Sequence, residues 1–106
     1  MLRGEIWWAD LDPTRGGEIR KRRPVVILTA DPLNRARRTV IVAPLTTGSA
    51  PRPPLVVPTP SAGPESKAVC DQIRALDKSR LSQRIGRLSV ADLAGVEGAL
   101  KIVLAL

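Results

Sequence analysis

Residues 24–30 have the sequence PVVILTA and residues 39–45 the sequence TVIVAPL. Both runs are rich in β-branched residues and have the length of a strand, and a polar, arginine-rich connection separates them. They therefore predict two core strands. Other short apolar runs predict further strands, at Glu5–Leu11, Leu55–Val57, Ala68–Ala75 and Arg84–Leu88. The sequence thus predicts a mainly β protein of about five short strands.

The C-terminal part of the chain has a helical pattern instead. Ser89 followed by Asp92 resembles a helix N-cap with an acidic first turn. Apolar residues then recur at helical spacing to the end: Val90, Leu93, Val96, Leu100 and Val103. A helical turn is also expected at Asp77–Leu81, whereas the prolines between Gly48 and Pro64 leave no room for a helix. We expect a single domain over residues 1–106, with the terminal helix closing a small β-barrel.

The charge of the chain points to a class of partner. There are 17 lysines and arginines against 10 acidic residues, which gives a formal net charge of +7. Seven of these basic residues lie between Arg20 and Arg38, where Asp31 is the lone acid. Such a cationic patch favours nucleic acid, because it attracts polyanions and releases their counterions. A solvated basic face, or an interface for an acidic protein, would have the same composition.

Residues that are missing exclude several kinds of chemistry. The chain has no histidine and one cysteine, Cys70, so it lacks the ligands of a zinc site, a histidine acid–base catalyst and an internal disulfide. It also lacks the glycine motifs of phosphate and dinucleotide sites. No apolar run approaches the ~20 residues of a membrane span, and acidic residues interrupt the N-terminus. We therefore expect no metal, no cofactor, no membrane association and a cytoplasmic location.

Three polar features stand out against the apolar background. The first is GGEIRKRRP at Gly16–Pro24, whose proline fixes the entry into a strand and holds Arg23 at its mouth. The second is Pro44–Thr47 at the end of the other core strand, and the third is Gln72 with Arg74 on one face of a strand. Each alone also fits a structural role, as a salt-bridged turn, a strand-terminal turn and a solvent-facing pair.

Together, four motifs resemble the MazF/PemK (Kid) ribonuclease toxins of bacterial toxin–antitoxin systems. They are WADLDP at Trp8–Pro13, GGE followed by four residues and RPVVIL at Gly16–Leu28, IVAPLT at Ile41–Thr46, and DQIRALD at Asp71–Asp77. The resemblance runs in order across nearly the whole chain. Its most specific part is the Glu-x4-Arg-Pro spacing followed by the strand-end threonine. It implies the small SH3-like β-barrel shared with the gyrase toxin CcdB, usually as a homodimer.

The resemblance also implies an activity. The chain would be a sequence-selective, metal-independent endoribonuclease, or mRNA interferase, that cuts single-stranded RNA and is inhibited by an acidic MazE-like antitoxin. Arg23 and Thr46 match the catalytic positions, and Glu18 belongs to the same site. RNA contacts are expected from Arg20, Lys21, Arg22, Thr47, Gln72 and Arg74. Where the family has GSEQ, Gly17 precedes Glu18 and Ile19 follows it here. A hydroxyl and an amide that could order the loop are therefore missing.

RNA cleavage needs neither histidine nor metal. The 2′-hydroxyl can attack the adjacent phosphorus and leave a 2′,3′-cyclic phosphate and a free 5′-hydroxyl. The protein then supplies a base, an acid and groups that stabilise the phosphorane. Arg23 offers a planar fork for two phosphate oxygens, and Thr46 a hydroxyl donor. Because a guanidinium with a pKa above ~12 is a poor base, Glu18 is the better candidate to take the 2′-proton or to orient Arg23.

Two other functions fit the same sequence. A CcdB-like toxin poisons gyrase by protein contact through its C-terminal end, but here that end is aliphatic and has no aromatic anchor. A nucleic-acid-binding barrel without activity is the third possibility. Within the barrel, alternation predicts that one of Trp7 and Trp8 is buried, while the other could stack on a base. Cys70, which has no histidine partner, is expected to be a small core residue.

Overall fold

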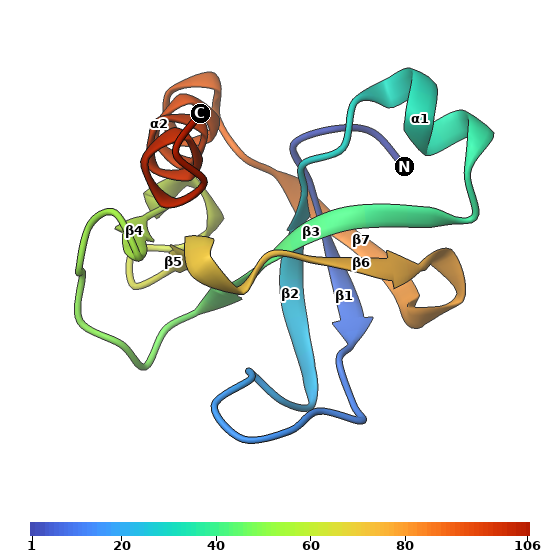
Figure 1. Cartoon of the computed structure of the whole chain (residues 1–106), viewed down its shortest axis with the longest axis horizontal. Coiled ribbons are helices and arrows are strands. Elements are labelled where there is room, and N and C mark those ends of the chain that lie inside the picture. The colour runs from blue at the N-terminus through green and yellow to red at the C-terminus, as the bar shows by residue number, and fades with distance from the viewer.

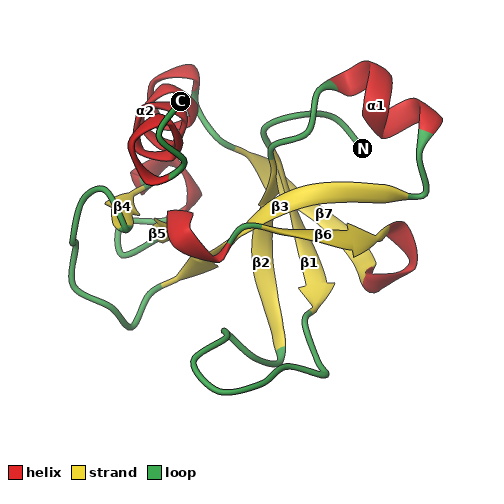
Figure 2. Cartoon of the chain, in the orientation of Figure 1, coloured by secondary structure: helices red, strands yellow, loops and turns green.

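The computed structural model describes residues 1–106 as seven strands, two α-helices and three 3-10 turns (Figure 1, Figure 2). The strands are β1 (Glu5–Asp10), β2 (Arg22–Ile27), β3 (Thr39–Thr46), β4 (Val56–Pro58), β5 (Lys67–Val69), β6 (Arg74–Asp77) and β7 (Leu81–Arg87). The helices are α1 (Asp31–Ala36) and α2 (Val90–Val103), and the turns are η1 (Pro60–Ala62), η2 (Cys70–Gln72) and η3 (Lys78–Arg80). The mainly β fold with a C-terminal helix is confirmed. Ser89 caps α2 as expected, because its Oγ accepts a hydrogen bond from Asp92 N at 3.1 Å.

All strand pairs are antiparallel, and β3 is the centre of the sheet. The strand order is β4-β5-β3-β2-β1-β7, and β6 also pairs with β3. One edge of β3 pairs with β2, while the other pairs with β6 over Thr39–Val42 and with β5 over Leu45–Thr46. The end strands β4 and β7 do not pair with each other, so the expected barrel is an open one.

Two hydrophobic clusters lie on the two faces of the sheet. Alternation along β2 sends Val26 to one cluster and Val25 and Ile27 to the other. The first cluster also contains Val96 and Ala99 of α2, so this helix covers that face. The terminal helix therefore packs on its own sheet through Leu93, Val96, Leu100 and Val103, whereas Val90, the first residue of the predicted apolar face, is 88% exposed.

The strand expected over Ala68–Ala75 is instead two strands separated by η2. β5 pairs with the end of β3 and β6 with its beginning, which leaves Ala43 and Pro44 between the two paired stretches. Proline has no N–H to donate to a partner strand, and a break in the ladder fits its position. The interruption moves Gln72 from a strand into a turn.

The arginine-rich connection contains the helix α1, which the sequence pattern did not indicate. Asp31 and a proline begin it, but six residues are too few to show a helical period. This connection follows the end of β2 opposite to Arg20–Arg23 (Figure 1). A six-residue strand spans roughly 20 Å. The cationic patch expected over Arg20–Arg38 is therefore two separate groups, and Arg35, Arg37 and Arg38 lie away from the start of β2.

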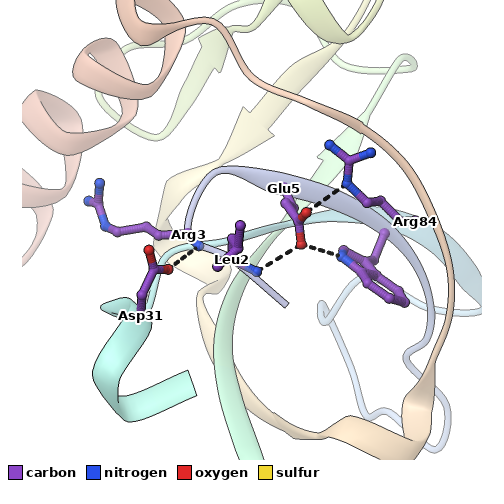
Figure 3. A network of polar contacts seen from close by, with 6 residues as sticks. Leu2, Arg3, Glu5, Asp31 and Arg84 are labelled. Carbon is purple, nitrogen blue, oxygen red and sulfur yellow. Dashed lines mark hydrogen bonds and ion pairs between the residues drawn. The ribbon is translucent and has the colours of Figure 1, made fainter. Parts of the chain in front are cut away.

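A polar network joins the N-terminus to the sheet (Figure 3). The carboxylate of Glu5, which is 7% exposed, accepts hydrogen bonds from Leu2 N at 2.7 Å, Trp7 Nε1 at 3.2 Å and Arg84 Nε at 2.7 Å. Next to it, Arg3 N donates to Asp31 Oδ1 at 2.7 Å. The network fixes the ends of β1 and α1 to each other. Neither helix of the chain has the length and apolar character to cross a bilayer.

Candidate functional site

The strand register brings Arg23 and Thr46 to the same place. β2 and β3 pair Val25 with Pro44 and Val26 with Ala43. The same register, continued by two residues, sets Arg23 opposite Thr46, and residues directly opposite each other project to the same face. Both residues also line one cavity of about 620 Å³. Two candidates that are 23 positions apart in the sequence therefore belong to one site.

Backbone geometry fixes the approach to Arg23. Lys21 has a φ of 70°, which is left-handed and unfavourable for a residue with a side chain. Its N–H donates to Asp12 Oδ1 at 3.2 Å and its carbonyl accepts from Leu11 N at 2.9 Å, so the two residues that follow β1 hold the turn in place. Arg23 Nε donates to the Arg20 carbonyl at 3.0 Å. Its two terminal nitrogens have no protein partner, which leaves the outer fork free for an anion.

Thr46 and its neighbour provide hydroxyls at the same cavity. Thr46 Oγ1 accepts a hydrogen bond from Gly48 N at 3.3 Å, so the hydroxyl proton is free to be donated. Thr47 is exposed and also lines the cavity. A free guanidinium fork beside two hydroxyls is a donor set suited to a phosphodiester.

The two tryptophans have different environments. Trp7 packs against the second hydrophobic cluster, and its indole donates to Glu5. Trp8 lines the cavity, and the guanidinium carbon of Arg22 lies 4.9 Å from the centre of its ring. Arg22 is held there by a hydrogen bond to Ser82 Oγ at 3.2 Å. Both tryptophans are half-buried, so neither is the fully buried residue that alternation predicted, although Trp7 packs against the core and Trp8 lies at the cavity.

Three predicted site residues lie around a second cavity of about 400 Å³. Glu18, Gln72 and Arg74 line it, and none of them lines the cavity of Arg23 and Thr46. Glu18 is exposed, and its Oε1 accepts a hydrogen bond from Arg15 N at 2.5 Å. The structure thus gives Glu18 no contact with Arg23.

Gln72 and Arg74 hold backbone rather than pointing freely into the second cavity. Gln72 Oε1 accepts from Ile19 N at 2.7 Å, and its Nε2 donates to the Gly17 carbonyl at 3.2 Å. Arg74 Nη1 donates to the Leu11 carbonyl at 3.2 Å. Gln72 therefore holds the loop around Gly17 and Ile19, where this chain lacks the hydroxyl and the amide of the family's GSEQ motif. The remaining predicted RNA contacts, Arg20 and Lys21, are exposed on this loop and line neither cavity.

One wall of the first cavity comes from a segment that contains none of the predicted site residues. This wall is residues 61–66, and it contains Glu65, the one carboxylate that lines the cavity. Asp92 Oδ2 holds the wall to the start of α2 by accepting hydrogen bonds from both N and Oγ of Ser61. At its base, Thr59 Oγ1 and Ser66 Oγ lie 3.0 Å apart. No local pattern marks Glu65 as a site residue, because only the tertiary fold brings it there.

The single thiol is protected from reaction. Cys70 is fully buried in the first hydrophobic cluster, as expected for a small core residue. Burial, and to a lesser degree the charge of Asp71, raises the pKa of the Cys70 thiol to about 11. The thiolate fraction at neutral pH is therefore very small, which removes Cys70 as a nucleophile.

Comparison with known proteins identifies the family. The model described as "PemK-like, MazF-like toxin of type II toxin-antitoxin system" matches residues 2–104. The chain belongs to this toxin family. Its relatives include the endoribonuclease MazF9 of Mycobacterium tuberculosis, 39% identical over 96% of this chain and 94% of the relative. The endoribonuclease PemK of Escherichia coli is 38% identical over 98% of this chain and 82% of the relative. The family inferred from the four motifs is confirmed.

Solved structures of MazF/PemK proteins share the fold along the whole chain. MazF from Deinococcus radiodurans superposes with a TM-score of 0.86 at 25% identity, covering 100% of this chain and 97% of its own. A mycobacterial endoribonuclease, solved in complex with its cognate antitoxin, has a TM-score of 0.82 at 25% identity and covers 100% of this chain and 96% of its own. This chain thus has the same overall fold as these two proteins.

Proposed function

We propose that this protein is the toxin of a toxin–antitoxin pair and a sequence-selective, metal-independent endoribonuclease that cuts single-stranded messenger RNA. The observation that carries the proposal is the meeting of Arg23 and Thr46 at one cavity, with the outer guanidinium fork and a hydroxyl proton both free. Relatives that are 38–39% identical and carry the name endoribonuclease support the same activity.

The proposed reaction uses the RNA's own nucleophile. The 2′-hydroxyl gives its proton to a carboxylate and attacks the adjacent phosphorus, the bond to the 5′-oxygen breaks, and that oxygen takes up a proton from water, so the products carry a 2′,3′-cyclic phosphate and a 5′-hydroxyl. Arg23 holds two non-bridging oxygens with its planar fork, and Thr46 donates to the oxygen on which charge develops. Both roles need donors that are already oriented, which the position of these residues at the strand ends provides.

The base that accepts the 2′-proton is one of two carboxylates. Glu18, proposed because it belongs to the same short segment as Arg23, lies at the neighbouring cavity. Glu65 lies at the cavity of Arg23 itself. Separate Glu18→Gln and Glu65→Gln variants decide between them. The variant that loses the base has a lower kcat and no longer shows the acid limb of the pH–rate profile. The other variant keeps that limb.

RNA is proposed to extend from the cavity along the basic loop. Trp8, backed by Arg22, offers a ring for a base to stack on, and Arg20, Lys21 and Thr47 provide phosphate contacts. Gln72 and Arg74 take part by holding the backbone of the loop and of Leu11, which makes them positioning residues. Base preference is then set by the loop that Gln72 fixes.

Two protein partners are proposed. An acidic MazE-like antitoxin would compete with RNA for the exposed cations of the loop, which agrees with the cognate antitoxin bound to the mycobacterial relative. A second copy of the chain would cover the apolar C-terminus, where Ile102 is 68% and Leu106 86% exposed. Light scattering of the purified protein gives the mass of a dimer if this is correct, and Leu106→Glu shifts it to a monomer. We also propose a cytoplasmic location, where messenger RNA is available.

A cleavage assay tests the nuclease. Purified protein is incubated with mixed-sequence RNA and EDTA, and the fragments are analysed by mass spectrometry. Fragments ending in a cyclic phosphate are expected, and a substrate with one 2′-deoxy sugar 5′ to the scissile phosphate resists cleavage. Intact RNA would point to a gyrase-poisoning or binding protein instead, and normal cutting of the deoxy substrate would reject the 2′-hydroxyl mechanism.

A further inference from the structure

Lys67 of β5 is a buried lysine without a counter-ion. The residue is 8% exposed, and the one hydrogen bond of its ammonium is to the neutral carbonyl of Glu65, at 2.8 Å. The two ion pairs of the chain are Arg3 with Glu97 and Arg84 with Glu5, so Lys67 belongs to neither. Burying an ammonium without a compensating charge is costly, and an apolar residue of similar length would avoid that cost.

The position of this lysine relates it to the candidate site. β3 and β5 pair Thr46 directly with Lys67, so the two side chains project to the same face of the sheet, with Cβ atoms roughly 5 Å apart. Arg23 lies opposite Thr46 on the other side of β3 when the register of β2 is continued. The three residues therefore form a row across β2, β3 and β5, with the threonine between two cations.

The hydrogen bond of Lys67 also joins it to a wall of the cavity. Its acceptor, Glu65, belongs to the wall of residues 61–66 that lines the cavity of Arg23 and Thr46. Lys67 itself lines neither cavity, so in the free protein its charge acts from behind that wall. In a poorly hydrated environment a charge at this range acts more strongly than it would in water.

We propose that Lys67 is an electrostatic positioning residue of the ribonuclease site. Its side chain lies beside that of Thr46 on the same face of the sheet, and its positive charge favours the additional negative charge that the phosphodiester gains on becoming a phosphorane. The inference rests on the proposed nuclease function. It also explains why the sheet retains a cation that has no carboxylate partner, since a phosphate group at the neighbouring cavity would supply the missing negative charge.

Substitutions at Lys67 separate this role from a structural one. Lys67→Met removes the charge and the hydrogen bond, Lys67→Gln removes the charge but keeps a donor, and Lys67→Arg keeps the charge. Arg35→Met removes an exposed cation of α1, at the other end of β2, and serves as the control. For each variant, kcat and KM are measured on a short cleavable RNA at two salt concentrations, and the midpoint of urea unfolding is recorded.

If the proposal is correct, Lys67→Met and Lys67→Gln each lower kcat/KM on the order of tenfold, mainly through kcat, a smaller loss than removal of a direct oxyanion donor causes. The salt dependence of kcat/KM becomes weaker in both. Lys67→Arg stays within a few-fold of the original protein and Arg35→Met is unchanged. The unfolding midpoint of Lys67→Met is equal to or above that of the original protein, because a buried unpaired charge has been removed.

Two results overturn the proposal while leaving the nuclease intact. One is full activity in Lys67→Gln, whether or not Lys67→Met is folded, because the charge is then dispensable. The other is a loss of activity that parallels a loss of stability and has the original salt dependence, which indicates a structural role. If the unsubstituted protein does not cleave RNA at all, the proposed function itself fails and this inference fails with it.

Discussion

The two cavities beside β3 use their polar side chains in different ways. At the first cavity, Arg23 keeps its outer fork free and Thr46 keeps its hydroxyl proton free. At the second, both amide atoms of Gln72 and one nitrogen of Arg74 bind backbone, and Glu18 accepts a hydrogen bond from the chain. Free donors in a cavity can bind and act on a ligand, whereas donors already engaged hold the structure around it. The first cavity therefore fits the chemistry and the second fits support of the loop.

The residues of the two cavities also differ in the backbone that carries them. Arg23 and Thr46 lie at the ends of long, well-paired strands, so the sheet fixes their backbone without using their side chains. Glu18 lies in the connection between β1 and β2, which has no strand partner and needs side chains to order it. Substitutions in the two cavities should therefore lower activity for different reasons and by different amounts.

The largest effect is expected at Arg23. Arg23→Lys keeps the charge but loses the planar fork, and we expect kcat to fall about 10²–10³-fold with little change in the unfolding midpoint. Single-turnover cleavage of a fluorescent RNA measures the loss. Arg35→Lys, an equal change at exposed α1, should leave cleavage unaffected. Activity of Arg23→Lys within a few-fold of the original would show that the first cavity does not hold the reacting phosphate.

A smaller and different effect is expected at Gln72. Gln72→Leu removes both hydrogen bonds to the loop at Gly17 and Ile19. Each bond contributes roughly 1 kcal/mol, so the loop should open more often, and KM should rise about tenfold while kcat changes less. Hydrogen exchange at the Ile19 amide reports the opening directly. Unchanged exchange together with a raised KM would mean that Gln72 contacts RNA itself.

Local sequence patterns were sufficient to predict the central strands and to place Arg23 and Thr46 at the ends of these strands. The β-branched runs predicted β2 and β3, and the spacing of Arg23 and Thr46 relative to these runs placed both residues at strand ends that meet. The terminal helix followed from apolar spacing and the Ser89 cap. These elements are local, or pair in a simple register, so the pattern contains the information that they need.

The rest of the site depends on contacts that no local pattern encodes. Glu65 reaches the cavity because Asp92, 31 residues beyond Ser61, holds the intervening wall. The division of 68–75 into two strands depends on where β3 offers free edges. Glu18 is near Arg23 in sequence, yet the loop carries it to the other cavity. Closeness in sequence therefore predicted which residues share a site within the strands, but it did not do so within the loops.

The wall of the first cavity can be loosened at Asp92. Asp92→Ala removes the acceptor for both N and Oγ of Ser61, and we expect KM to rise about threefold to fivefold with kcat nearly unchanged, a modest effect for a displaced wall. Ser89→Ala is the matched control, because it removes only the cap of α2. It should cost about 1 kcal/mol of unfolding free energy and leave KM unchanged. Equal KM values in the two variants would show that the wall does not depend on Asp92.

The smallest effect on activity is expected at Glu5, whose side chain lines neither cavity and binds Leu2 N, the Trp7 indole and Arg84 (Figure 3). Burial alone would raise the pKa of the Glu5 carboxyl, but hydrogen bonds from Leu2 N, the Trp7 indole and Arg84 outweigh it and leave the pKa below its usual 4.5. A lowered folded-state pKa stabilises the fold above about pH 4.5, and this stabilisation is lost as the pH falls through the folded-state value.

Glu5→Gln tests the direction of this pH dependence of stability. It also tests whether Glu5 stabilises the structure without taking part in cleavage. At pH 7 the variant should be less stable by roughly 1–3 kcal/mol, because charge-assisted bonds become neutral ones, while cleavage at 25 °C stays within twofold. As the pH falls through the folded-state pKa of Glu5, the difference in stability between the two proteins should shrink, because the native carboxylate then takes up a proton. Urea unfolding at a series of pH values from 7 downward measures it. A difference that stays constant over the whole series would mean that the charge of Glu5 contributes nothing, and that only the shape of its side chain fills the network.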